Sequence, residues 1–411
     1  VVSPLISLMK DQVMALKDAG VSAAFLNSSL TPEQMRIVYR NIRAGKYKII
    51  YIAPERLDGE GFVSLAQGLK ISLVAVDEAH CISQWGQDFR PSYLRILDFL
   101  DKLPQRPVLA AFTATATKQV QDDIERNPYI VCISIMCITT GFDRPNLFFE
   151  VGRPKNKAAT LQSLVAQRRD KCGIVYCATR TAVEKVCDAL RGTGISATRY
   201  HAGLADEERR QNQEDFLYDR SAVMVATNAF GMGIDKSNVG FVIHYNMPKS
   251  LEAYYQEAGR AGRDGEKADC ILLYSPGDVQ TARFLIQNSG QNEELTEEQR
   301  QAVLQRDDER LDAMIGYCKT TRCLRGYILD YFGQAHQESC GNCGNCRAIF
   351  AVKDITTEAQ MILSCVKRAR DTLGYSVGAT LIIRTLCGSA EQRVLELGLD
   401  QLTTYGLMKG T

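Results

Sequence analysis

Short runs of apolar, often β-branched residues recur along the chain up to about residue 276, with stretches of helical character between them. Runs of this length that are apolar throughout are typical of parallel strands buried inside a sheet. The sequence therefore predicts an α/β fold built from parallel sheets. The predicted strands lie at 48–54, 73–80, 108–115, 172–179, 222–229, 241–248 and 270–276.

The pattern also predicts how the chain is divided. It restarts after the turn-rich segment FDRPN (142–146), which indicates a connector between two sheets. After about residue 277 it gives way to a charged, glutamine-rich helix, and beyond a cysteine cluster the residues Thr357–Gln360 predict a capping box that opens a small three-helix unit. The domains expected are 1–138, 139–276, 277–350 and 351–411.

Composition narrows the class of protein. The chain has 411 residues, of which 45% are hydrophobic, and its charged residues nearly cancel to +1, so any basic surface must be local. No apolar run approaches the roughly 20 residues of a membrane span, and the N-terminal residues lack the pattern of a signal peptide. Most of the fourteen cysteines lie in apolar runs, as buried thiols do in a reducing compartment. We expect a cytoplasmic protein with no membrane partner.

Two adjacent carboxylates, Asp77 and Glu78, stand at the end of the run LVAVDEAH (73–80). Ligands bind at the C-terminal ends of strands in open α/β sheets. One carboxylate there can hold Mg²⁺ through water while its neighbour orients or deprotonates the attacking water, as nucleotide hydrolysis requires. The alternative is an acidic strand end that caps a helix.

Two further segments fit that chemistry. Thr113 and Thr115 carry hydroxyls suited to relaying a change at a nucleotide to nearby loops, although threonine is common in strands. Arg260 and Arg263 lie three residues apart among glycines, and this spacing predicts both guanidiniums on one face of a helix, aimed across a cleft. An arginine delivered from a second domain stabilises the charge of a transition state. The alternative is a network of surface salt bridges.

The segment CISQWGQDFRPSY (81–93) holds the only tryptophan, Trp85, with Phe89, Arg90 and Tyr93 close by. Aromatic rings stack on unpaired bases whatever their sequence, and an arginine can take phosphate, so the composition suits single-stranded nucleic acid. Its glycine and proline favour a loop over a packed core, which is the alternative for the aromatic residues.

Three thiols at two-residue intervals, Cys340, Cys343 and Cys346, predict a zinc site with glycines that let the chain wrap an ion. A closed tetrahedral site needs a fourth ligand, for which Cys323 is the best candidate and Cys318 and His336 are the rivals. Four protein ligands leave no open position, so the zinc would be structural.

At this point a family resemblance becomes specific. The motifs VVSPLISLMKDQV, YIAPERL, VDEAHCISQWGQDFRPSY, AFTATAT, FDRPNL, IVYCATR, YHAGL, VATNAFGMGIDK and YYQEAGRAGRDG stand in the order and spacing of superfamily 2 helicases of the RecQ family. The resemblance covers essentially the whole chain. It implies two RecA-like parallel-sheet domains, a helical zinc-binding module and a partial winged-helix (RQC) domain. It also implies an ATP-dependent 3′-to-5′ DNA helicase of repair and recombination that uses ATP, Mg²⁺ and Zn²⁺ and binds single-stranded and partly duplex DNA.

The resemblance implies roles for individual residues as well. Asp77 resembles the Mg²⁺ ligand, Glu78 the catalytic base, Arg263 the arginine finger and Arg260 its phosphate-facing companion. Nucleotide contacts or sensing are implied for His80, Gly233, Asp235 and Gln256. The loop with Trp85, Phe89 and Arg90 would couple DNA binding to hydrolysis, together with Gln87, Thr113 and Thr115; the family usually has histidine where Gln87 stands. Cys323 matches the module's remaining zinc ligand.

One expected part does not occur in the sequence. There is no G-x-x-x-x-G-K-[ST] phosphate loop, and no glutamine motif for adenine. In the family both lie immediately before the segment with which this chain begins, and the chain ends inside what resembles the winged-helix domain, before its hairpin. We therefore expect truncation at both ends and impaired activity. The alternatives are a nucleotide-independent DNA-binding or regulatory protein that has lost its phosphate loop, and an RNA helicase of the DEAD/DEAH type. Residues 124–141 match the family poorly.

Overall fold

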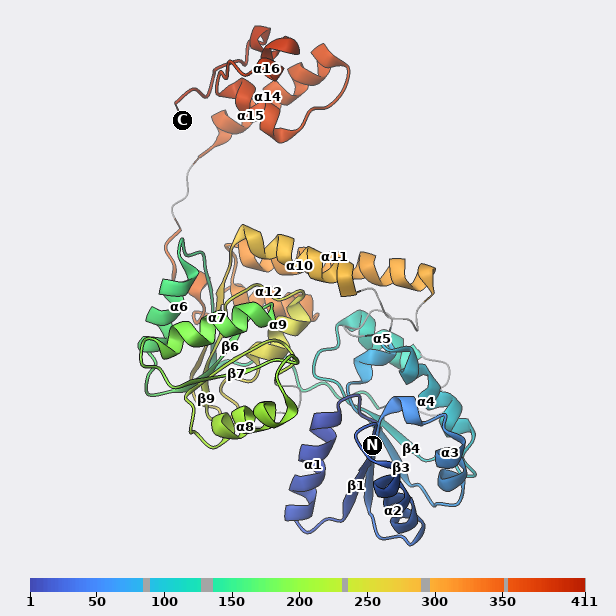
Figure 1. Cartoon of the computed structure of the whole chain (residues 1–411). Coiled ribbons are helices and arrows are strands. Elements are labelled where there is room, and N and C mark those ends of the chain that lie inside the picture. The colour runs from blue at the N-terminus through green and yellow to red at the C-terminus, as the bar shows by residue number, and fades with distance from the viewer. Residues whose placement is uncertain (84–88, 127–135, 231–235, 290–295, 351–353, 411) are drawn as a thin grey trace. The chain divides into compact units, whose positions relative to one another are not determined.

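The structure is a computed structural model of the 411 residues and describes all of them except 84–88, 127–135, 231–235, 290–295, 351–353 and 411. The chain divides into two compact units, Val1–Ala348 and Ile349–Thr411 (Figure 1). The first unit carries all the described strands, and the second is helical. The finer division of the first unit into domains stays a prediction.

The first sheet is held together by the N-terminal residues. Strand β1 (Ala23–Leu26) pairs in parallel with β2 (Ile49–Ile52), and β3 (Leu73–Val76) pairs in parallel with β4 (Val108–Ala111). Val2 forms parallel bridges with both Ile52 and Val76, so it joins the two pairs into one sheet. The helices of this part are α1 (Ile6–Asp18), α2 (Pro32–Arg43), α3 (Glu60–Gln67), α4 (Pro91–Asp101) and α5 (Lys118–Arg126), with 3-10 turns η1 (Pro54–Arg56) and η2 (Ala79–Ile82).

The second sheet has six parallel strands in the order β5-β10-β9-β6-β8-β7. Their bounds are β5 (Leu147–Gly152), β6 (Cys172–Tyr176), β7 (Ala197–Tyr200), β8 (Val223–Ala226), β9 (Val239–His244) and β10 (Ala268–Leu273). Parallel pairing confirms the predicted α/β class, and each of the seven predicted strands is present. Three short strands were not predicted: β1, β5 and β7.

Alternate residues of the second sheet enter two different cores, because successive side chains of a strand point to opposite faces. Val175 and Ile271 pack with α6 (Lys157–Ala166) and α7 (Arg180–Arg191) on one face. Ile174 and Cys270 pack on the other face, with α8 (Asp206–Leu217) and α9 (Leu251–Ala258).

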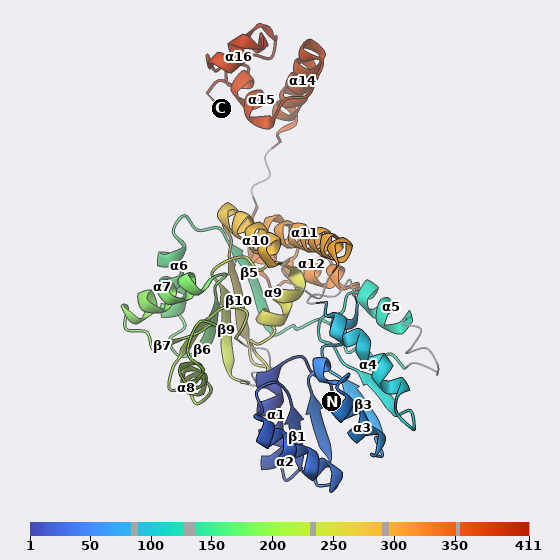
Figure 2. The same ribbon diagram turned by 45° about the vertical axis from the view of Figure 1, so that its right-hand side comes forward.

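The cysteine-containing region adds to that second face. It comprises α10 (Pro276–Ser289), α11 (Glu297–Lys319), α12 (Leu324–Tyr331) and the short α13 (Gly344–Arg347), and α10 and α11 lie side by side (Figures 1 and 2). Met314 and Tyr317 of α11 and Ile328 of α12 belong to the same core as α9. The region therefore shares the core on this face of the second sheet.

The unit Ile349–Thr411 has its own small core. It contains α14 (Thr356–Leu373), α15 (Ala379–Leu386), α16 (Gln392–Glu396) and the 3-10 turn η3 (Leu399–Gln401). The predicted capping box does not form, since the helix starts earlier than expected, at Thr356. Its first turn is stabilised instead by Asp354 Oδ1, which accepts the N–H of Thr356 at 2.9 Å.

Candidate active site and zinc centre

The paired carboxylates lie where β3 ends, and neighbouring groups fix the direction of Asp77. Its backbone N–H donates to the carbonyl of Val2 at 2.9 Å, and the Tyr93 hydroxyl donates to its carbonyl at 3.0 Å. Ser3 Oγ donates to one carboxylate oxygen at 3.2 Å, and the N–H of Glu78 donates to the other at 3.0 Å. Both oxygens thus have a partner that orients them, while the side chain stays half-buried at the strand end.

Glu78 adopts a left-handed backbone conformation, with φ 48° and ψ 46°. This region disfavours residues with a Cβ, and such strain is concentrated at functional sites. The next residue anchors the turn, because the N–H of Ala79 donates to the carbonyl of Phe112 at 2.8 Å. The turn directs the Glu78 side chain to the strand edge, where its Oε2 lies 3.4 Å from His80 Nδ1.

His80 connects the carboxylates to the predicted threonine relay. Its ring is 3% exposed, and Nδ1 lies 2.9 Å from Thr113 Oγ1. Thr113 Oγ1 in turn accepts the N–H of Thr115 at 3.4 Å, and Thr115 is buried. Five predicted site residues from two neighbouring strand ends therefore meet: Asp77, Glu78, His80, Thr113 and Thr115.

The aromatic segment is described only in part. Trp85 and Gln87 lie outside the described residues, while Phe89 and Arg90 are half-buried just before α4. Tyr93 departs from the expectation that it contacts nucleic acid, because its side chain is fully buried in the first core. Burial also raises the pKa of its hydroxyl well above the usual range. Tyr93 is on the inward face of α4, three and four residues before the buried Ile96 and Leu97, and it supports Asp77 instead.

The two arginines do not share a helix face, contrary to the prediction. Helix α9 ends at Ala258, and Arg260 and Arg263 lie in the turns that follow. Gly262, between them, has φ +57°, which no helix allows. Arg260 is buried, whereas Arg263 is exposed.

Of the remaining nucleotide candidates, Gln256 is half-buried on α9, while Gly233 and Asp235 lie outside the described residues.

The predicted connector holds this arginine turn (residues 259–266), a role that the sequence did not suggest. The Arg144 guanidinium donates to the carbonyls of Gly259, Ala261 and Gly262 at 3.4, 3.1 and 2.8 Å. Asn146 Nδ2 donates at 2.9 Å both to Gly262 and to Glu266. A Cβ on Gly262 would lie 2.5 Å from Asn146 Nδ2, so the close approach requires glycine.

The four predicted cysteines form one cluster. The sulfurs of Cys323, Cys340, Cys343 and Cys346 lie within 4.8 Å of one another, and the Cys340 and Cys346 sulfurs are 4.0 Å apart. A tetrahedral zinc site with bonds of about 2.3 Å has sulfurs about 3.8 Å apart, so the cluster fits zinc. The rivals do not join it, since Cys318 is absent from the cluster and His336 Nε2 lies 2.9 Å from Asp330 Oδ1.

Backbone N–H groups favour the thiolate form that zinc requires. Cys323 Sγ accepts from Gly326 at 3.3 Å, and Cys343 Sγ accepts from Cys346 at 3.4 Å. Burial acts to raise the pKa of the Cys346 thiol, but hydrogen bonds from Ser339, Cys343 and Cys323 together lower it to about 6. Burial raises the pKa of the Cys340 and Cys343 thiols, so a bound cation would be needed to keep all four cysteines as thiolates.

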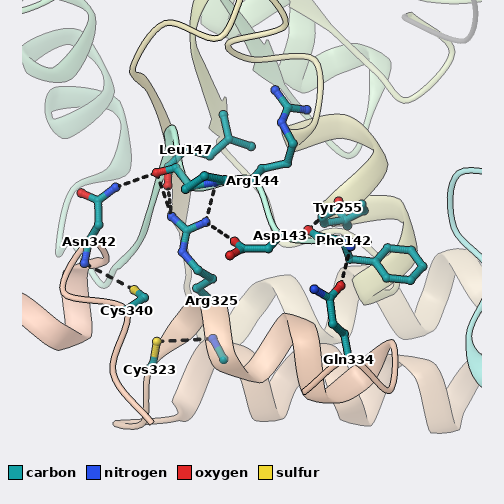
Figure 3. A network of polar contacts seen from close by, with 12 residues as sticks. Phe142, Asp143, Arg144, Leu147, Tyr255, Cys323, Arg325, Gln334, Cys340 and Asn342 are labelled. Atoms are coloured by element: carbon teal, nitrogen blue, oxygen red, sulfur yellow. Dashed lines mark hydrogen bonds and ion pairs between the residues drawn. The ribbon is translucent and has the colours of Figure 1, made fainter. Parts of the chain in front are cut away.

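Arg325, on α12, connects the zinc cluster to the connector (Figure 3). It is 5% exposed and donates to Asp143 Oδ1 at 2.8 Å and to the Leu147 carbonyl at 2.6 Å. It also donates to the carbonyl of Arg144. No local sequence pattern indicated this residue, because its partners on the connector lie far away in the chain.

Four family models match consecutive parts of the chain. They are described as DEAD/DEAH box helicase (1–123), helicase conserved C-terminal domain (156–265), RecQ zinc-binding (276–347) and RQC domain (350–411). The third contains the four clustered cysteines, which are the zinc site of that module.

Curated relatives match over the whole chain. An ATP-dependent DNA helicase RecQ of Bacillus subtilis is 47% identical over 409 residues, which cover 100% of this chain and 67% of the relative. A protein of the same name from Haemophilus influenzae is 38% identical, and the match covers 100% of this chain and 64% of that relative. The chain thus spans about two thirds of the length of these relatives.

Solved structures support the fold alone. The helicase MrfA bound to DNA and AMPPNP matches with a TM-score of 0.55 and 20% identity, covering 69% of this chain and 42% of that one.

In the part of the chain that the structure describes, no helix is both long and apolar enough to cross a membrane.

Proposed function

Because the chain belongs to the RecQ family of DNA helicases, we propose that it acts in an ATP-driven motor that moves 3′ to 5′ along single-stranded DNA. Its work would be strand separation in DNA repair and recombination in the cytoplasm. The observation that carries this proposal is the convergence of Asp77, Glu78, His80 and Thr113 at one edge of the first sheet.

In this proposal the oriented carboxylate of Asp77 holds Mg²⁺ through water, and Glu78 accepts a proton from the attacking water. Bound Mg²⁺ neutralises charge on the phosphates of ATP. Arg263 and Arg260 stabilise the charge that develops during phosphoryl transfer, as finger and companion. Gln256, Gly233 and Asp235 complete the nucleotide contacts.

The same edge of the sheet would transmit DNA binding to hydrolysis. Trp85 and Phe89 stack on bases and Arg90 binds phosphate. The hydrogen bond between His80 and Thr113, and the one that the Thr115 N–H donates to Thr113, support a relay from the carboxylates to the neighbouring strand end. Gln87 would contribute a hydrogen bond, but it cannot carry the charge that histidine can.

The 411 residues contain no G-x-x-x-x-G-K-[ST] motif, and this observation favours a second candidate function, DNA binding without nucleotide. We propose that these residues alone bind ATP weakly and unwind little DNA. Strand separation driven by ATP in the 411-residue chain would contradict this part of the proposal.

One experiment separates the candidates. ATP hydrolysis is measured for the 411 residues, and for any longer natural chain that contains them, with single-stranded DNA, with single-stranded RNA and without nucleic acid. If the chain is a DNA helicase, single-stranded DNA should stimulate ATP hydrolysis well above the rate with RNA. Glu78→Gln should lower the stimulated rate about a hundredfold or more. Stimulation by RNA alone would favour the DEAD/DEAH-type alternative. DNA binding with no hydrolysis in any form would favour the nucleotide-independent one.

A further inference from the structure

We infer that the zinc centre positions the turn carrying Arg260 and Arg263, through a chain of contacts that runs from Arg325 to the connector and from Arg144 and Asn146 to the turn. Arg325, Arg144 and Asn146 are positioning residues in this arrangement. The functional consequence rests on the proposed role of the two arginines in ATP hydrolysis, whereas the mechanical link does not.

The first step joins the zinc loop to the connector. The ligand Cys323 caps the helix that carries Arg325, since its Sγ accepts the N–H of Gly326 at 3.3 Å. Asn342 joins the ligand Cys340 to the connector, because its N–H donates to Cys340 Sγ at 3.4 Å and its Nδ2 donates to the Pro145 carbonyl at 3.2 Å. Cys343 adds a β-bridge to Phe149. Cys340 through its sulfur and Cys343 through its backbone are thus coupled to residues 145–149, so the zinc ion would fix the distance between α12 and the connector.

The second step fixes the shape of the connector itself. The buried guanidinium of Arg325 gathers Asp143 and the carbonyls of Arg144 and Leu147 around one planar group (Figure 3). A planar, multiply donating cation holds several acceptors in one relative geometry, which a lysine cannot do. Gln334, three residues after the end of α12, also accepts the N–H of Phe142.

The third step passes from the connector to the turn. Arg144 and Asn146 donate to four carbonyls, those of Gly259, Ala261, Gly262 and Glu266. Arg260 and Arg263 lie inside this span. A shift of the connector would therefore move the backbone from which both arginine side chains extend.

The turn has a second attachment, to the start of β9. The N–H of Gly262 donates to Val239 at 2.9 Å, and the N–H of Asp264 donates to Ser237 at 3.3 Å. These bonds do not involve the zinc module, so loss of zinc should loosen the turn without unfolding the sheet. Their amides are also the probes for a direct test.

Amide hydrogen exchange of residues 259–266 is compared in the zinc-loaded chain, after zinc removal with a chelator, and in the zinc-loaded variant Arg144→Met. Both changes should accelerate exchange in the turn by about tenfold or more, since Arg144→Met removes charge-assisted hydrogen bonds to the turn and zinc removal releases the module that holds the connector. Exchange in β6 and β8 should change much less. Arg144→Met should retain zinc, which separates the third step from the first two.

Arg325→Met and Arg325→Lys test the second step, the contacts of Arg325 with the connector. The zinc content is measured in each variant. Arg153→Met is the matched control, because Arg153 also joins the second domain to the zinc module by one bond, to the Cys318 carbonyl at 2.8 Å, but does not touch the connector. Faster exchange of the turn in both Arg325 variants and not in the control supports the inference. Unchanged exchange after chelation, or equal acceleration in the turn, β6 and β8, would overturn it.

The functional consequence has its own measurement. In a form that hydrolyses ATP, Arg144→Met should lower kcat by about tenfold or more and change KM little, because the arginines act on the transition state. An exchange effect with normal kcat would overturn the functional part alone. A form with no DNA-stimulated hydrolysis at all would count against the proposed function and leave the exchange test standing.

Discussion

Glu78 shows at the scale of one residue how the proposed chemistry and stability oppose each other. Its backbone lies in a region where a Cβ is disfavoured, at a cost of about 1–2 kcal/mol. The surrounding hydrogen bonds, above all the one from Ala79 to Phe112, hold it there. The strained turn is retained because it directs the carboxylate to the edge of the sheet.

This strain predicts an inverted order of two variants. In most folded positions glycine is less stable than alanine by roughly 0.5–1 kcal/mol. At position 78 we expect Glu78→Gly to be more stable than Glu78→Ala by about 1 kcal/mol, because both lose the carboxylate but only glycine removes the strain. Urea unfolding of the two variants measures the difference. If alanine proved the more stable, the left-handed conformation at this site would be wrong.

A second residue pair gives a pH-dependent prediction. Lys236 is 6% exposed, and its Nζ lies 2.7 Å from Asp219 Oδ1 and 5.3 Å from the centre of the Phe216 ring. The hydrogen bond from Lys236 lowers the pKa of Asp219 below its usual range. A carboxyl whose pKa is lower in the folded state stabilises the protein above its unfolded pKa, about 3.9, and this contribution is lost as pH falls through the folded value.

Asp219→Asn should therefore lower stability by about 1 kcal/mol or less near pH 7, since the carboxylate is more than half exposed and screened by solvent. Asparagine keeps the acceptor and tolerates the left-handed backbone at this position. The gap between variant and parent in urea unfolding should shrink only below about pH 4. Asp215→Asn, which breaks a more exposed pair with Arg220, is the control and should cost less. A gap that was independent of pH would exclude the ion pair as its cause.

At the scale of elements, the zinc module is the clearest case of a structure held by its ligands. Cys323 precedes α12 and Cys343 precedes α13, and both sulfurs accept N–H groups from the first turn of those helices. Zinc binding and formation of the helix ends are thus one process.

We expect about one zinc ion per chain, and its loss in Cys343→Ser with a lower melting temperature, because a structural site needs four ligands. Cys318→Ser and His336→Asn should keep the ion, since neither side chain belongs to the cluster. Metal analysis of purified variants checks this. Zinc loss in His336→Asn with retention in Cys323→Ser would reverse the ligand assignment.

The sequence predicted elements best where the evidence for them was local. Strands such as β6 and β8 are continuous apolar runs, and all seven runs of this kind are strands. Strand β7 (ATRY) is short and lacks a strong apolar run, and it forms because it pairs with β8. The four zinc ligands were predictable because three of them follow each other at fixed intervals.

The errors have physical reasons as well. The spacing of Arg260 and Arg263 suggested a helix, but Gly259, Gly262 and Gly265 between and around them end α9 and open a turn. Tyr93 was predicted to contact nucleic acid because it follows Trp85, Phe89 and Arg90 in the sequence. Its burial depends on how α4 packs in the first core, and a local pattern does not show this packing. The contacts of Arg325 with the connector join segments about 180 residues apart, and a single sequence gives no sign of such pairs.

At the scale of the whole molecule, the core of the unit Ile349–Thr411 is built from that unit's own residues. It consists of Cys365, Ala369, Ile382, Leu386, Val394 and Leu399. The other core clusters draw on residues of Val1–Ala348 only. We therefore expect a chain of residues 1–348 to keep its zinc and to melt within about 2 °C of the longer chain, because neither unit contributes residues to the core clusters of the other.

The isolated residues 349–411 should be less stable to unfolding than residues 1–348. A domain of fewer than about 70 residues with so small a core has little stability to spare. Circular dichroism should show helix that is lost in a broad transition at low temperature or low urea, while residues 1–348 unfold cooperatively. A fall of several degrees in the melting temperature of residues 1–348, measured beside the 411-residue chain with equal zinc content, would mean that the two units stabilise each other.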